Sequence, residues 1–112
     1  MGGARPAPHA TAYGQVLLGA PPAELPRLTR HTVVAPGALA ARLARVRAAG
    51  LAVCAEEFRL GEVTVAAPVR GPAGTVAALG VTVPTGVPLD RVAAAVRAAA
   101  TRVRPPVPPP SS

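Results

Sequence analysis

Few side chains in this sequence have the chemistry of a catalytic or metal-binding group. The candidate bases are His9 and His31, the candidate nucleophile is Cys54, and Glu56-Glu57 is a pair of adjacent acids. A hydrolase triad needs a nucleophile, a base and an orienting acid. A single cysteine allows neither an internal disulfide nor a thiolate zinc site. We therefore predict that the chain is not an enzyme and uses no metal or cofactor.

The local context of these residues favours structural roles. His9 begins a segment with helical spacing and His31 lies in a polar loop, so both histidines are expected on the surface. Cys54 lies inside a Val-rich strand, which predicts a buried and inert thiol. Glu56 and Glu57 are neighbours at a strand end and therefore point to opposite faces, so they cannot share one substrate atom.

Composition bounds the class of protein. The chain has 112 residues, enough for one domain, and its apolar half is mostly Ala and Val. Its formal charge is +7, but the arginines are spread along the chain and aromatic residues make up only 2%. Nucleic-acid binding is therefore the weakest function considered. The sequence shows neither a membrane span nor a signal peptide, which predicts a cytoplasmic protein.

The two ends differ from the middle. Residues 1–8 are mostly Gly, Ala and Pro, and residues 104–112 are mostly Pro, so both are expected to be disordered tails. A single domain is expected over residues 9–103.

Helical spacing occurs in three segments of that domain. Residues 9–20 predict a short helix stopped by Pro21-Pro22, and residues 36–49 a longer one that ends at Gly50. Residues 88–103 predict the last helix, with Pro88 at its first helical position.

Three Val-rich segments alternate with period two, at residues 51–57, 62–69 and 75–83, with a hairpin turn at residues 71–74 between the last two. The order is helix, helix, strand, strand, strand, helix. It predicts an α+β fold in which an antiparallel meander of at least three strands has helices packed on one face. Such a small sheet would leave open edges.

Alternation places Cys54, Thr64, Gly80 and Thr82 on one face of this sheet. These small or weakly polar residues are compatible with two interpretations. They can line a cavity with a few convergent polar groups, or they can lie beneath a closely packed helix.

Several segments together resemble a known family. They are residues 9–15 (HATAYGQ), 28–33 (LTRHTV), 47–53 (RAAGLAV), the Glu56-Glu57 pair, 61–69 (GEVTVAAPV) and 76–84 (VAALGVTVP). In order and spacing they resemble the second half of the effector-binding domain of the IclR family of bacterial transcriptional regulators, over residues 9–103. The resemblance implies a GAF/profilin-like effector domain with a small-molecule pocket, preceded by a winged helix, in dimers or tetramers on DNA. Because the sequence starts without the winged helix and the first strands of that domain, a truncated sensor is expected.

The resemblance also implies a set of effector-binding residues. Backbone N–H groups of Ala12 and Tyr13 would hold a carboxylate at a helix start. Side chains would come from Cys54, Thr64, Gly80 and Thr82, although the family usually has Asp, Cys and Ser at the first three of these positions. Losing a buried acid and a hydroxyl predicts a more apolar ligand, or none.

Two further departures concern the backbone. The hairpin between Val69 and Val76 is one residue shorter than the family usually has, and a one-residue slip would turn Gly80 and Thr82 to the other face unless the turn absorbs it. Val87 stands where the family has a capping Thr, which costs about 1 kcal/mol of helix stability.

The function expected is therefore effector sensing without a DNA-binding domain, so that no direct DNA or membrane contact is expected. The partners would be a small carboxylate or a more apolar metabolite, together with another copy or an intact regulator. The alternative is a remnant or oligomerisation module that binds no ligand.

Overall fold

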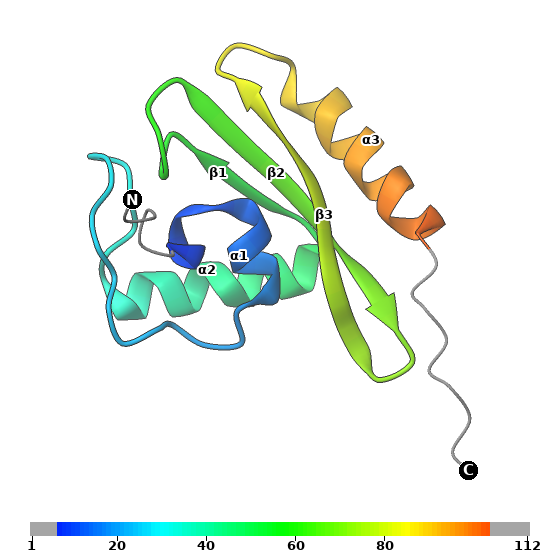
Figure 1. Ribbon diagram of the computed structural model, residues 1–112, viewed down its shortest axis with the longest axis horizontal. Helices are drawn as coiled ribbons and strands as arrows, with labels where there is room; N and C mark the ends of the chain where they lie inside the picture. The colour runs from blue at the N-terminus through cyan, green and yellow to red at the C-terminus, as the bar shows by residue number, and fades with distance from the viewer. Residues whose placement is uncertain (1–6, 104–112) are drawn as a thin grey trace, which may run out of the picture.

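The computed structural model describes residues 7–103, which form an antiparallel three-stranded sheet between two layers of helices (Figure 1). The described elements are η1 (Pro8–Ala10), α1 (Ala12–Leu17), α2 (Pro36–Ala49), β1 (Ala52–Ala55), β2 (Glu62–Gly71), β3 (Gly74–Pro84) and α3 (Leu89–Arg102). This is the α+β order expected from the sequence, with the 3-10 helix η1 added at its start.

The sheet is a meander with strand order β1-β2-β3. Its central strand β2 is buried along most of its length, because both of its faces are covered. Helix α3 covers one face, where Val63, Val65 and Val96 belong to one hydrophobic cluster. Helix α1 covers the other face, where Ala12, Cys54 and Ala66 form a second cluster that Val46 of α2 completes.

This arrangement corrects the expectation that the helices share one face. Side chains of β2 alternate between its two faces, and their sizes explain why helices cover both. Its Val residues project to the α3 side, whereas Thr64 and Ala66 leave room on the other side for the backbone of α1 to come close. Because the residues of β2 are small on the α1 side and branched on the α3 side, a helix can pack on each face of the sheet.

The first helix differs most from its expected extent. Residues 9–20 do not form one helix, because Thr11 is extended (φ −119°, ψ 150°) and separates η1 from α1, which ends at Leu17 well before Pro21. Gly14 permits the fold-back of η1 onto α1, since a Cβ there would overlap the carbonyl oxygen of Pro8.

The other boundaries move by only a few residues. Helix α2 has the expected bounds and ends at Gly50, whose φ is 65°. β1 is shorter than residues 51–57, and Pro88 precedes α3 as its N-cap. Ala7 is buried and Pro8 begins η1, so these two residues are part of the fold and not of the expected tail. The rest of that tail and residues 104–112 lie outside the described residues.

The pairing of β2 with β3 is irregular close to the hairpin turn. Gly71 pairs with Gly74 and Arg70 with Thr75, but Val69 pairs with Ala77, so Val76 is an extra residue in β3. This bulge shifts the register of β3 by one residue beyond the turn. As a result Thr82 pairs with Thr64, and Gly80 and Thr82 stay on the face that was expected.

Candidate functional site

The six residues singled out from the sequence gather on the face of the sheet that α1 covers. Cys54 pairs with Thr64 and Thr64 with Thr82, so these three side chains form a row across β1, β2 and β3. Ala12 of α1 lies over this row and Tyr13 packs against the same cluster. Gly80 occupies the neighbouring row beside Ala66.

The start of α1 is fastened to the sheet by one side chain of this row. The backbone N–H of Ala12 donates to Thr64 Oγ1 at 2.9 Å, in a fully buried contact. Thr11 Oγ1 accepts from Gly14 N, and the Thr11 carbonyl accepts from Gln15 N. Ala12 was expected to offer its N–H to a carboxylate, and in this structure that donor is already satisfied by another expected site residue.

Cys54 lies below this contact, 2% exposed. Burial, with a smaller contribution from the Glu57 carboxylate, raises the pKa of its thiol to about 12, although Arg42 and a hydrogen bond from Thr64 oppose the shift. The thiol is therefore protonated and shielded at neutral pH, as an inert core cysteine should be.

The two ends of the row differ in exposure. Cys54 and Thr64 are buried, whereas Thr82 is exposed on β3 and its hydroxyl makes none of the side-chain hydrogen bonds found within residues 7–103. At Gly80 a Cβ would overlap the carbonyl oxygen of Val65 and lie 2.8 Å from Ala66 Cα. The close approach of β2 and β3 therefore requires a glycine at this position.

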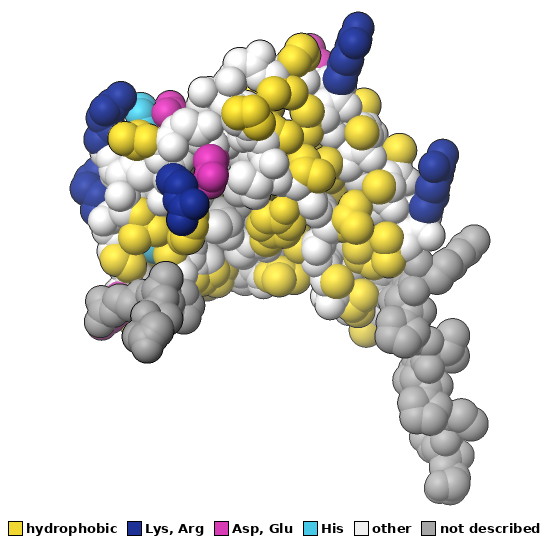
Figure 2. All heavy atoms as spheres, turned by 45° about the horizontal axis from the view of Figure 1, so that its top comes forward, with side chains coloured by type: hydrophobic (Ala, Val, Ile, Leu, Met, Phe, Trp, Pro, Cys, Tyr) yellow, Lys and Arg dark blue, Asp and Glu magenta, His cyan; other side chains and the backbone are white. Residues whose placement is uncertain are grey.

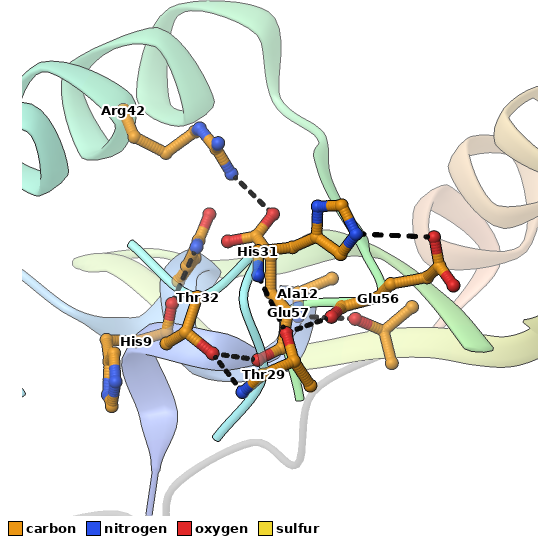
Figure 3. Close-up of polar contacts among 10 residues, drawn as sticks. His9, Ala12, Thr29, His31, Thr32, Arg42, Glu56 and Glu57 are labelled. Atoms are coloured by element: carbon orange, nitrogen blue, oxygen red, sulfur yellow. Dashed lines mark hydrogen bonds and ion pairs between the residues drawn. The ribbon is translucent and has the colours of Figure 1, made fainter. Parts of the chain in front are cut away.

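Glu57 connects this face to α2. Its carboxylate oxygen Oε2 accepts from Arg42 Nη1 at 3.0 Å, and its other oxygen Oε1 is buried without a partner (Figure 3). The loop before α2 adds two threonines, because Thr29 and Thr32 donate their hydroxyls to the carbonyl oxygens of Glu56 and Glu57.

Glu56 points elsewhere. Its backbone is left-handed (φ 57°) in a turn after β1, and its Oε1 accepts from Gly61 N at 2.9 Å while Oε2 lies 3.8 Å from His31 Nε2. The two acids therefore do not share a substrate atom, but the reason is this turn and not strand alternation.

The histidines have different environments. His31 is exposed, as expected. His9 is only 1% exposed, and its Nε2 lies 2.8 Å from the Pro26 carbonyl oxygen, so the expectation of a surface position was wrong. No pattern in the sequence indicated that Gln15 is buried, yet it is 1% exposed and its Nε2 donates to the His9 carbonyl oxygen at 2.8 Å.

Two cavities of the fold lie away from the start of α1. One groove of about 520 Å³ runs between β3 and α3 and is lined by Leu79, Val81, Thr82, Val83, Val92, Ala95, Val96 and Ala99. A second cavity of about 270 Å³ lies at the end of α1, away from its start.

Among residues 7–103 no group of three or more His, Cys, Asp or Glu side chains could hold a metal ion. None of the helices in this range is long and apolar enough to cross a membrane.

Comparison with known proteins gives one family and one fold. Residues 2–104 match the family model described as the C-terminal domain of the bacterial transcriptional regulator IclR. A putative transcriptional regulator, RHA06195 of Rhodococcus sp. RHA1, is 32% identical with a TM-score of 0.77, over 84% of this chain and 45% of that one. Among curated proteins none is similar enough to match.

Two similar structures contain ligands. An IclR homolog of Microbacterium hydrocarbonoxydans complexed with 4-hydroxybenzoate is 27% identical (TM-score 0.77), over 83% of this chain and 42% of that one. The inducer-binding domain of the PobR transcription factor of Acinetobacter, a double mutant in complex with 3-hydroxybenzoic acid, is 29% identical (TM-score 0.74), over 83% of this chain and 62% of that one. This chain thus spans less than half of the two longer proteins.

Proposed function

We propose that this chain, which belongs to the IclR family of bacterial transcriptional regulators through their C-terminal domain, is a non-enzymatic sensor of a small-molecule effector. The effector would bind on the face of the sheet that α1 covers. Residues Ala12, Tyr13, Cys54, Thr64, Gly80 and Thr82 form the proposed site.

The observation that carries this proposal is the row Cys54–Thr64–Thr82 under the start of α1. Its two ends offer different surfaces, since the thiol at one end is buried and protonated while the Thr82 hydroxyl at the other is exposed. With Gly80 lacking a side chain, this face provides few polar partners. A ligand with a flat apolar body and a small number of oxygens fits such a surface best.

Small aromatic acids meet this description. Two similar structures contain hydroxybenzoates, which supports the same ligand class for this chain. The Thr82 hydroxyl would bind a polar substituent, and Tyr13 would pack against the ring.

The proposed mechanism is a population shift. A ligand that contacts both α1 and β3 favours one arrangement of helix and sheet, and this changes how effector domains pair. The domain would act through pairing with a second copy or with another regulator of the family.

The test is a thermal melt with 4-hydroxybenzoate, 3-hydroxybenzoate and unsubstituted benzoate, on the wild type and on Thr82→Val. An effector at the proposed site raises the Tm of the wild type and raises that of Thr82→Val less. A Tm that no compound raises, or raises equally in both proteins, contradicts the proposal.

A second function, oligomerisation without a ligand, is favoured by a different observation. Strand β3 pairs on one side only within residues 7–103, and its Val76 and Val81 are 54% and 40% exposed. Figure 2 shows hydrophobic side chains spread over the side of the molecule that carries α3, with arginines at its margin. Exposed apolar edges of this kind favour association. Analytical ultracentrifugation of the wild type and Val81→Lys distinguishes the two functions, because only oligomerisation through β3 predicts a loss of association in the variant.

A further inference from the structure

We propose a second ligand site, separate from the effector site, that binds a small carboxylate with an apolar body at the C-terminal end of α1. The site is the cavity of about 270 Å³ lined by Val16, Leu17, Leu18, Gly19, Val46, Arg47, Pro68, Arg70 and Thr75. None of the six residues of the proposed effector site lines it.

Four elements and one connecting segment build this cavity. The last turn of α1 and the extended residues after it form one wall, and Val46 with Arg47 of α2 form a second. The hairpin end of the sheet closes it with Pro68, Arg70 and Thr75, near the bulge at Val76. Bulges of this kind bend a strand and increase its local twist.

The charges at the cavity are of one sign. Arg47 and Arg70 both line it, and no acidic residue does. The ion pairs found within residues 7–103 join Glu57 to Arg42, Glu56 to His31 and Glu62 to Arg59, so neither cavity arginine takes part in one. Two guanidinium groups beside an apolar wall attract an anion, and arginine binds carboxylates through paired hydrogen bonds.

A neighbouring arginine is already occupied. Arg97 Nη2 donates to the Ala49 carbonyl oxygen at 3.0 Å and so binds the C-terminal end of α2. The Arg70 guanidinium lies close by, within 3.8 Å of where a Cβ of Gly50 would stand. Arg97 thus binds the end of α2, whereas the side chains of Arg47 and Arg70 make no hydrogen bond or ion pair within residues 7–103.

The apolar part of the ligand follows from the wall and its rim. Val16 and Val46 belong to or pack against the buried cluster under α1. Leu17 lines the same cavity and is 57% exposed, so it offers apolar surface to a ligand. The Thr75 hydroxyl adds one hydrogen-bonding group. The volume of about 270 Å³ admits a ring of benzoate size.

The experiment is an NMR titration of the ¹⁵N-labelled chain with benzoate, and with benzyl alcohol as the neutral analogue of the same size. The expected result is that benzoate shifts the amide signals of Leu17, Leu18 and Thr75, and that Arg70→Gln weakens this binding about tenfold. Arg91→Gln removes the same charge from an exposed position of α3 and leaves the affinity unchanged.

Three results would overturn the proposal. They are an absence of shifts at these residues with millimolar benzoate, equal binding of benzyl alcohol, and an equal loss of affinity in Arg70→Gln and Arg91→Gln. Failure here is distinguishable from failure of the effector site, because that site is followed through the signals of Tyr13, Cys54 and Thr82 and through Thr82→Val.

Discussion

Thr64 Oγ1 accepts a hydrogen bond from the backbone N–H of Ala12, 52 residues earlier in the chain, and this contact is buried. It joins the first turn of α1 to the central strand of the sheet. Thr64 also pairs with Cys54 of β1, so it lies between two residues of the proposed effector site. The hydrogen bond from Ala12 to Thr64 therefore fixes the start of α1 on the sheet, beside the hydrophobic cluster that packs the two together.

Thr64→Val should destabilise the fold. Valine has nearly the same volume, but it leaves the Ala12 N–H buried without an acceptor, which costs about 1–3 kcal/mol. Thr82→Val is the matched control, because that hydroxyl is exposed and valine suits a strand. Urea unfolding followed by circular dichroism measures both. Equal unfolding free energies for the two variants would show that the Thr64 contact contributes nothing.

Gly80→Ala should be strongly destabilising, because the new Cβ would overlap the Val65 carbonyl and press on Ala66. The expected loss is about 2 kcal/mol or more, with weakened pairing of β2 and β3. Gly37→Ala is the control, since it lies in α2 with nothing within 4 Å of the added Cβ. That variant should gain up to about 1 kcal/mol. Thermal melts compare the two, and a tolerated alanine at position 80 would contradict the close approach.

Arg42→Gln should cost about 3 kcal/mol, because Glu57 is buried and would lose the cation that compensates its carboxylate. Arg59→Gln is the control: its pair with Glu62 is exposed and 3.8 Å long, so its loss should cost less than about 1 kcal/mol. Chemical denaturation of both variants at low and high salt tests the difference, which should persist at high salt.

Stability should fall in alkaline solution because of Cys54. Its pKa is about 12 in the folded chain against 9.0 for the free thiol, so between these values only the unfolded chain releases the proton. The contribution is present in full below pH 9 and is lost at about 1.4 kcal/mol per pH unit toward pH 12. Cys54→Ala should remove this slope, and parallel pH profiles of the two proteins would refute the assignment.

Local patterns of the sequence were sufficient for much of this fold. The stripe of Leu39, Leu43 and Val46 predicts α2 with its observed bounds, and all three residues are buried. Alternation predicts the shared face of Cys54, Thr64 and Thr82, which the strand register confirms. These features depend on neighbours close in the chain, where periodicity is informative.

Contacts between distant segments were beyond such patterns. Helices on both faces, the burial of His9 against Pro26 and the occupation of the Ala12 N–H by Thr64 each depend on how separate segments meet. The split of residues 9–20 into η1 and α1 likewise follows from packing at Gly14. The cavity at the C-terminal end of α1 could not be predicted from the sequence, because Arg47 and Arg70 are distant in the chain and line one cavity only in the folded structure.

The most direct test of the sensor proposal is an NMR titration of the ¹⁵N-labelled chain with 4-hydroxybenzoate, for the wild type and for Thr82→Val. Binding at the proposed site predicts saturable shifts at Tyr13, Cys54 and Thr82 in the wild type, and a weaker affinity in the variant. Shifts confined to other residues, or none at all, would contradict the claim that this face of the sheet receives the effector.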